Sequence, residues 1–365
     1  MIHLPETDVL LVGAGPIGLE TAAALKLSDI RYLQLEAGNL ASTISWYAPG
    51  TQIFSAPERL AIAGVPFFLS PEIRATREDY LNYLRTVAAL HKLEVRSYRR
   101  VVAIRKREAG FEADIVRSDH GVGGPGEVAC SQPHESPDER VSCARIILAI
   151  GDMHWPNLLG IPGEELPHVS HYFEEPHRYF GQKVTIVGAK NSAAEAAVRL
   201  SRQGTFVTIC HRGDHFDDTR IKPWLMSELR LLLRENKMRF VPRVTPTAID
   251  ASAVHVRHES DMVETIPTDA VLLLTGYRQD PSLFEQLGVE LTGPGRVPTF
   301  DPATMESNVK GVYLAGTCSA GTQIGGVTAF VETSHVHVDR ILRALGAKTC
   351  PWIQTTVRCE ADREQ

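Results

Sequence analysis

Three glycines, Gly13, Gly15 and Gly18, have the spacing of a turn that can hold a pyrophosphate. The first permits a tight turn, the second lets a phosphate approach the backbone, and the third lets a helix pack on a strand. The unpaired N–H groups and positive dipole end of that helix attract phosphate. Glu36 follows 23 residues after Gly13 (36 − 13) and can accept hydrogen bonds from ribose hydroxyls. This pattern predicts a dinucleotide with a free ribose diol, such as FAD.

A second, degenerate turn begins at Gly188, with Lys190 and Ala193 in place of the other two glycines. His211 stands 23 residues after Gly188 (211 − 188) and is followed by Arg212. Arginine pairs with a 2′-phosphate that a carboxylate would repel, so this turn is expected to bind NADPH rather than NADH. The alternative for the basic pair is a solvated loop. Further candidates for the same phosphate are basic residues downstream, Arg220 and Lys222.

Both turns lie in a repeated strand–turn–helix–strand order. The first has expected strands at 8–12 and 31–36, and the second at 183–187 and 206–210, with a helix after each turn. An apolar strand at 270–274 ends the second repeat. Two such units in one chain have a chemical reason, because nicotinamide passes hydride to a flavin when both stack in one cleft.

A strand at 311–315 and a helix over 326–345 are expected to return to the first unit, which makes it discontinuous. The predicted fold class is therefore α/β, with two Rossmann-like, three-layer dinucleotide-binding domains and the NADPH domain inserted into the FAD domain. The expected domains are 1–160 with 290–347 for FAD, and 161–289 for NADPH. Residues 348–365 are expected to form a loose tail. Residues 118–140, rich in glycine, proline and charge, are expected to be a surface insertion and a candidate for disorder.

The 365 residues carry a net charge of −6, which gives no electrostatic reason to expect nucleic-acid binding. The N-terminus has no basic region before an apolar core, and no apolar stretch reaches membrane-spanning length. The six cysteines are scattered, which is typical of a reducing compartment. We therefore expect a cytoplasmic protein without nucleic-acid or membrane partners.

No two cysteines have the Cys-x-x-Cys spacing, which excludes a zinc ribbon and a local redox dithiol. Cys318 is a candidate redox cysteine, because a helix dipole at a strand-to-helix junction can lower a thiol pKa. An inert packed cysteine is the alternative. His335 and His337 would not share a helix face and are expected to be structural. No metal is expected, since three histidines that cluster in sequence fit no ligand spacing, His168, His171 and His177.

Taken together, the motifs resemble those of the thioredoxin-reductase-like flavoproteins of low molecular weight, and most closely those of the bacillithiol disulfide reductase (YpdA-type) family. The resemblance runs from about Asp8 to Leu345. Besides the first turn with Glu36, the segments that carry it are 47–60, 160–164, 171–173, 188–192, 221–224, 275–277 and 305–309. The Lys-Asn-Ser run at 190–192 and the Lys-Pro-Trp run at 222–224 distinguish this family from ordinary thioredoxin reductases.

This resemblance implies a homodimer or higher homo-oligomer that binds FAD, oxidises NADPH and passes electrons to a small oxidant, such as a low-molecular-weight disulfide. The residues expected to contact FAD are Gly13, Gly15, Pro16, Ile17, Glu36, Gly151, Gly316 and Thr317. Those expected to contact NADPH are Gly188, Lys190, Asn191, Ser192, His211, Arg212 and Arg220. No residue is assigned to catalysis.

The chain departs from its relatives at three points. It lacks the Cys-x-x-Cys of thioredoxin reductases, and Ile17 stands where bacillithiol-type members carry a cysteine, so no thiol can act there. Thr317 replaces the usual aspartate, although a hydroxyl can still donate to a flavin ribityl or phosphate oxygen. Two alternatives stay open. The run at 181–184 before Gly188 is also similar to flavin monooxygenases. Ile17, Lys190 and Thr317 are compatible with a non-catalytic redox sensor that only holds its nucleotides.

Overall fold

The computed structural model describes residues 1–70, 73–117, 136–324, 326–347 and 352. By its internal contacts the chain divides into two units. Unit 1 comprises Met1–Trp46, Gly50–Trp155 and Tyr277–Gln365, and unit 2 comprises Tyr47–Pro49 and Pro156–Gly276. Most of the insertion expected at 118–140 and nearly all of the tail expected at 348–365 lie outside the described residues. Among the described helices, none combines the length and apolar character needed to span a bilayer.

Unit 1 is built on a mixed sheet with strand order β4-β3-β2-β7-β6-β5, in which β1 and β20 also pair with β7. Its strands are β1 (Ile2–His3), β2 (Thr7–Val12), β3 (Tyr32–Leu35), β4 (Val95–Arg96), β5 (Arg99–Arg107), β6 (Gly110–Arg117), β7 (Glu139–Leu148) and β20 (Val312–Leu314). The pairs β2–β3, β2–β7 and β7–β20 are parallel. The carboxyl ends of these four strands therefore lie at one edge of the sheet.

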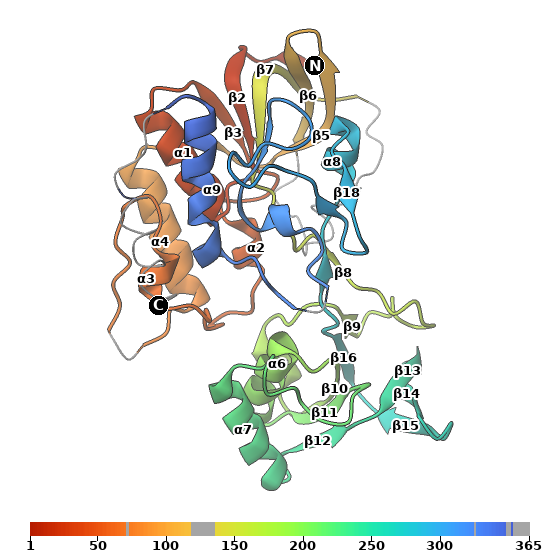
Figure 1. Cartoon of the computed structure of the whole chain (residues 1–365). Coiled ribbons are helices and arrows are strands. Elements are labelled where there is room, and N and C mark those ends of the chain that lie inside the picture. The colour runs from red at the N-terminus through yellow and green to blue at the C-terminus, as the bar shows by residue number, and fades with distance from the viewer. Residues whose placement is uncertain (71–72, 118–135, 325, 348–351, 353–365) are drawn as a thin grey trace. The chain divides into compact units, whose positions relative to one another are not determined.

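Alternate residues of β2 enter two different cores, which is the period-2 pattern of a strand buried on both faces. Val9 and Leu11 pack with residues of α1 (Pro16–Leu27) and α9 (Val331–Ala344). Leu10 and Val12 pack in the core that contains residues of β5 and β6. Figure 1 shows α1 and α9 side by side although they are far apart in sequence. The sheet thus lies between two layers. Helix α9 comes from the C-terminal part of the chain and packs with α1, so unit 1 contains two segments that are distant in sequence.

Helix α9 begins later than expected. The sequence predicts a helix from 326, whereas residues before Val331 form an irregular segment around the Gln323 side chain. Its amide oxygen accepts hydrogen bonds from the N–H groups of Thr328 (2.6 Å) and Ala329 (2.9 Å). A glutamine side chain five and six residues earlier thus holds these N–H groups outside the helix, and α9 begins only at Val331.

The remaining elements of unit 1 are short, apart from α4. They are α2 (Ser42–Ser45), α3 (Pro57–Leu60), α4 (Arg77–Leu90), α8 (Ser282–Leu287), η2 (Gly316–Ala320), and the pair β18 (Leu291–Thr292) and β19 (Val297–Pro298). β8 (Trp155–Pro156) pairs with β17 (Tyr277–Arg278). Thr76 caps α4 through a reciprocal capping box with Asp79. Residues 277–289, expected in the NADPH domain, lie in unit 1 because Phe284 of α8 is fully buried in its core.

Unit 2 has a parallel sheet with strand order β12-β11-β10-β16-β9. Its elements are β9 (Val169–Ser170), η1 (Pro176–Tyr179), β10 (Lys183–Val187), α6 (Asn191–Arg202), β11 (Phe206–Cys210), α7 (Pro223–Arg234), β12 (Met238–Val241), β13 (Val244–Ile249), β14 (Ala253–His258), β15 (Val263–Pro267) and β16 (Ala270–Leu273). Strands β13, β14 and β15 form a separate antiparallel sheet. In Figure 1, α6 and α7 lie on one side of the parallel strands and this antiparallel sheet on the other.

Candidate nucleotide-binding sites

In unit 1 the first glycine turn has the geometry that the sequence predicts. Gly13 has φ of 107°, and a Cβ there would lie 2.3 Å from the carbonyl oxygen of Ala149. A Cβ on Gly18 would lie 2.4 Å from the carbonyl oxygen of Gly13, so the helix packs directly on the turn. A Cβ on Gly15 would meet nothing within 4 Å. The turn is therefore closed on its protein side and open at Gly15.

Helix α1 begins after this open glycine with Pro16 at its first position. No side chain caps the helix, since Gly15 is the N-cap. The first N–H groups of a helix have no intrahelical partner and attract anions. The turn and the uncapped helix together form a cradle that fits a pyrophosphate.

Glu36, at the end of β3, has a second role that the sequence did not show. Its Oε2 accepts a hydrogen bond from Ala14 N–H (2.7 Å), and its Oε1 accepts from Gly38 N–H (2.9 Å) and the Ser42 hydroxyl (3.1 Å). Burial raises the pKa of this carboxyl, against the lowering effect of these hydrogen bonds. Glu36 therefore ties the turn to the next segment, and a ribose diol has to share its carboxylate with protein donors.

Three more of the residues expected to contact FAD come together at the same sheet edge. A Cβ built on Gly316, where φ is 82°, would lie 3.3 Å from Cβ of Ile17, so the first turn contacts the segment after β20. A Cβ built on Gly151 would lie 4.0 Å from the Thr317 hydroxyl. The carboxyl ends of β2, β7 and β20 thus bring Gly13–Ile17, Gly151 and Gly316–Thr317 to one region.

A partly buried carboxyl in this region was missed by the sequence analysis. Asp152 follows Gly151 and accepts a hydrogen bond from Gln323 (2.8 Å) and one from the Thr317 hydroxyl. Burial raises the pKa of Asp152. Gln279 donates to the carbonyl oxygens of Gly151 (3.0 Å) and Cys318 (2.9 Å). A polar residue directly after Gly151, shortly past the end of β7, was the only signal in the sequence, and its partners lie far along the chain.

His337 also positions a predicted contact residue. Its Nδ1 accepts a hydrogen bond from Gly316 N–H at 3.1 Å, which requires a ring without a proton on that nitrogen. Burial, and then the charge of Arg340, lower the pKa of His337 to about 4. His335 instead pairs with the buried Glu20 carboxylate at 2.8 Å. Both histidines are structural, as expected.

The hypothesis that Cys318 has a lowered pKa is wrong. Cys318 is fully buried inside the short helix η2, and its thiol donates to the carbonyl oxygens of Leu148 (3.0 Å) and Ala315 (3.2 Å). Burial raises its pKa to about 12. Burial likewise raises the pKa of Cys143 and of Cys210 to about 12. The three described cysteines are therefore protonated thiols at neutral pH; Cys130, Cys350 and Cys359 lie outside the described residues.

In unit 2 the second turn repeats the geometry of the first despite its degenerate sequence. Gly188 has φ of 135°, and a Cβ there would lie 2.4 Å from the carbonyl oxygen of Leu274. Helix α6 follows with Lys190 as its N-cap, and no side chain caps it. Ala193, in place of the third glycine, is buried, and a Cβ built on Gly188 would lie 3.6 Å from its methyl carbon. The anion-attracting helix start is thus preserved.

Asn191 links the second turn to the segment before α7. Its side chain donates to the carbonyl oxygen of Arg220 (3.0 Å) and accepts from Lys222 N–H (2.9 Å). Lys190 and Ser192 are exposed on either side of it. The structure therefore brings the backbone of Arg220 to the helix start. The guanidinium of Arg220 pairs with Asp217 at 3.0 Å.

The two basic residues after β11 differ in charge state. Burial, and then the charge of Arg212, lower the pKa of His211, so its ring is neutral at neutral pH. Arg212 is exposed and lines a hollow of about 290 Å³. Of the predicted pair, Arg212 alone supplies a positive charge. The residues of unit 2 therefore fit a nucleotide with an additional anionic group at this strand end.

Comparisons with known proteins agree with this geometry. The model of a family described as pyridine nucleotide-disulphide oxidoreductase matches residues 10–121 and 135–316. A Bacillus subtilis (strain 168) protein named bacilliredoxin reductase Bdr is 31% identical over 332 residues, covering 91% of this chain and 95% of that protein. A ferredoxin–NADP reductase of Ignicoccus hospitalis is 29% identical over 346 residues, covering 88% and 97%.

The fold is also found among solved structures. The structure of bacillithiol disulfide reductase Bdr (YpdA) from Staphylococcus aureus superposes with a TM-score of 0.83 at 28% identity, covering 94% of this chain and 98% of that one. The predicted resemblance and the predicted α/β class with two Rossmann-like domains are both confirmed.

Proposed function

Because the chain belongs to the pyridine nucleotide-disulphide oxidoreductase family, and is an NADPH-dependent flavoprotein reductase with FAD as cofactor, we propose that its acceptor is a low-molecular-weight disulfide, reduced without a thiol relay. One observation carries the second half of this proposal. Each of the three described cysteines is buried, with a pKa raised to about 12. A thiol relay needs an accessible thiolate. The first turn cannot supply one, because Ile17 stands where bacillithiol-type members carry a cysteine.

Two relatives support the choice of a disulfide. One is named a bacilliredoxin reductase and the other a bacillithiol disulfide reductase. The net reaction consumes NADPH, a proton and a disulfide RSSR, and yields NADP⁺ and two thiols RSH. Bound FAD supplies the two-electron chemistry that joins the two half-reactions.

The protein's own groups bind and orient the nucleotides in this proposal. The first turn and α1 would hold the FAD pyrophosphate at the open glycine Gly15, with Glu36 at the adenosine ribose. Gly151, Gly316 and the Thr317 hydroxyl would line the flavin side. The second turn and α6 would hold the NADPH pyrophosphate, with Arg212 at the 2′-phosphate. Unit 1 is accordingly the FAD domain and unit 2 the NADPH domain.

Two further expectations concern the oligomeric state and the cellular location of the protein. We infer a homodimer or higher homo-oligomer from the resemblance, which sedimentation of the FAD-loaded protein at several concentrations would test. A cytoplasmic location stays a prediction from cysteine usage and is tested by fractionation of the source cells.

The function is tested with the FAD-loaded protein, NADPH, and a panel of bacillithiol disulfide, glutathione disulfide and cystine under anaerobic conditions. We expect two thiols to form per NADPH oxidised with at least one disulfide, because the electrons balance only in that ratio. The Cys318→Ser variant serves as a control and should turn over the same disulfide at the same rate, since its thiol is buried and protonated.

Other outcomes would contradict the disulfide proposal. Reduction of an iron–sulfur protein without disulfide turnover would identify a ferredoxin-type reductase. Oxygen uptake coupled to substrate hydroxylation would identify a monooxygenase. Absence of flavin reduction by NADPH would support a sensor.

A further inference from the structure

The carboxyl ends of β11 and β12 lie level in the sheet of unit 2. The two strands are parallel, with Cys210 paired to Val241. Arg212 and Arg243 therefore each stand two residues past a paired strand end. The pairing continues beyond the strands, because Arg243 N–H donates to the carbonyl oxygen of Gly213 at 3.0 Å. Two arginines on neighbouring strands are thus held beside each other by backbone contacts.

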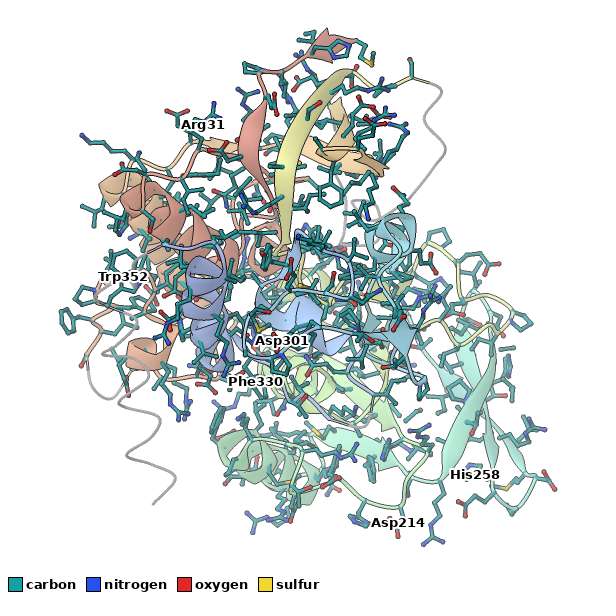
Figure 2. All side chains as sticks on the ribbon, turned by 45° about the horizontal axis from the view of Figure 1, so that its top comes forward. Arg31, Asp214, His258, Asp301, Phe330 and Trp352 are labelled. Atoms are coloured by element: carbon teal, nitrogen blue, oxygen red, sulfur yellow. The ribbon has the colours of Figure 1, made fainter. Side chains whose placement is uncertain are left out.

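A third arginine comes from the antiparallel sheet. Arg257 on β14 pairs in register with Thr245 on β13, two residues after Arg243. One hollow of about 290 Å³ is lined by residues of these elements: Arg212, Arg243, Thr245, Arg257, His258, Glu259 and Asp261. Figure 2 shows His258 and Asp214, the ion-pair partner of Arg243, on the same part of unit 2. Three arginines, one after β11, one between β12 and β13 and one on β14, therefore line one space.

Carboxylates match the arginines of this hollow in number, with Glu259 and Asp261 in its lining and Asp214 beside Arg243, but of the three arginines only Arg243 forms an ion pair within the described part of the chain. Arg243 makes an exposed ion pair with Asp214 at 3.5 Å, a distance too long for a strong hydrogen bond. Arg212 and Arg257 have no ion-pair partner among the described residues. The ring nitrogen Nε2 of His258 makes a hydrogen bond with Oε2 of Glu264 at 3.0 Å. The guanidiniums of Arg212 and Arg257 therefore keep their N–H donors available to a bound anion.

The position of the hollow identifies the anion. In a strand–turn–helix–strand nucleotide site, the residue after the second strand contacts the 2′ position of the adenosine ribose. In unit 2 that strand is β11, and the hollow begins at Arg212. A phosphate monoester carries about −1.5 to −2 charges at neutral pH and accepts paired hydrogen bonds from guanidinium.

We propose that Arg243 and Arg257, together with Arg212, bind the 2′-phosphate of NADPH, so that coenzyme choice is set by three strands and not by the β11 loop alone. This inference rests on the proposed role of unit 2 as the NADPH domain. Glu259 and Asp261, which line the same hollow, oppose the phosphate and lower its affinity. The hollow therefore holds two sets of residues with opposite expected effects.

The test measures dissociation constants of NADP⁺, NAD⁺, adenosine 2′,5′-bisphosphate and inorganic phosphate for the full-length, FAD-loaded protein by calorimetry. The first variant is Arg243→Gly. Arg243 has φ of 55°, a left-handed conformation that glycine adopts without strain, so removal of its guanidinium does not compromise the fold. The second variant is Arg257→Thr, which keeps strand propensity at an exposed position. Thermal unfolding checks both.

We expect each variant to weaken binding of NADP⁺ and of the bisphosphate by about tenfold, the loss of one charge-assisted contact, and to change NAD⁺ binding by less than about twofold. Glu259→Gln should instead tighten NADP⁺ binding by about twofold. Arg234→Ala is the matched control. Arg234 is exposed in the last turn of α7, which precedes β12 and lies toward the opposite edge of the sheet, so its loss changes the net charge equally.

The outcomes separate this inference from the function on which it rests. If wild type prefers NADP⁺ over NAD⁺ but Arg243→Gly and Arg257→Thr behave like Arg234→Ala, the hollow is not the phosphate site. Equal losses of NADP⁺ and NAD⁺ would also overturn it. If wild type itself shows no preference for NADP⁺, the assignment of unit 2 fails, and this inference fails with it. Tight binding of inorganic phosphate that does not compete with NADP⁺ would assign the arginines to a different anion.

Discussion

The two glycine turns have nearly the same backbone but opposite charges at the strand end that follows. Gly13 and Gly188 both have positive φ, and a Cβ on either would approach a carbonyl oxygen within 2.4 Å. After the first turn, the second strand ends in the buried carboxylate of Glu36. After the second turn, it ends at Arg212 beside two more arginines. In our proposal, the backbone of each turn holds a dinucleotide, and the charge at the next strand end selects which one.

Substitution of alanine for the first glycine of each turn is expected to have the largest effect on nucleotide binding. Gly13→Ala and Gly188→Ala each force a Cβ against backbone at a φ that alanine rarely adopts, with a cost of about 3 kcal/mol or more. Gly13→Ala should lose FAD yet bind NADP⁺, and Gly188→Ala should do the reverse. Flavin content and NADP⁺ calorimetry measure both. Loss of both nucleotides in either single variant would contradict independent sites.

A fall in pH is expected to destabilise unit 1 more than unit 2. The pKa of His337 falls to about 4 in the folded protein, from about 6.5 unfolded. A histidine with a depressed pKa stabilises the fold above its unfolded pKa, and this contribution is lost as pH falls toward the folded pKa. The loss is about 3 kcal/mol by pH 4. In unit 2, His211 also has a lowered pKa, but it is only half buried, so its effect is smaller.

The variant His337→Asn isolates this term, because an asparagine oxygen can accept the hydrogen bond from Gly316 N–H without titrating. The difference in unfolding free energy between wild type and variant, measured by urea titration from pH 7 to pH 4, should shift by about 3 kcal/mol in favour of the variant. A difference that stays constant with pH would contradict the assignment.

Gly15→Ala is expected to weaken FAD binding without a change in the stability of the apoprotein. A Cβ at this position meets no protein atom within 4 Å, so the free energy of unfolding of the apoprotein should not change. The same methyl group would hinder the approach of the pyrophosphate, and we expect FAD affinity to fall by about tenfold. Flavin fluorescence titration of the apoprotein measures this. Unchanged FAD affinity would place the phosphates elsewhere.

The smallest effect is expected at Cys318. Serine can donate the same hydrogen bonds as the thiol but fills less volume, so Cys318→Ser should cost about 1 kcal/mol of stability. The rate of disulfide turnover should be unchanged, as measured by NADPH oxidation. A loss of turnover with normal flavin content would give the thiol a chemical role.

Local patterns predicted the two turns, their strands and the fold class, because glycine spacing and apolar periodicity act over a few residues. The same patterns did not predict the Glu36 contacts with Gly38 and Ser42, which depend on where the chain turns next. They left a reactive and a packed thiol open at Cys318, since a helix dipole can be inferred from order along the chain but burial cannot; the structure confirms the packed thiol. The approach of Arg243 and Arg257 to Arg212 depends on strand register across unit 2, which no local pattern contains.

The central claim, that opposite charges direct FAD to unit 1 and NADPH to unit 2, is tested most directly by anaerobic stopped-flow absorbance. Wild-type protein and Arg212→Glu, both loaded with FAD, are mixed with NADPH and separately with NADH, and the loss of the oxidised-flavin band is followed. We predict that NADPH reduces wild type faster than NADH by about a hundredfold, and that Arg212→Glu removes this preference while flavin content stays the same. Equal rates with the two nucleotides in wild type, or a preference that survives in Arg212→Glu, would contradict the claim.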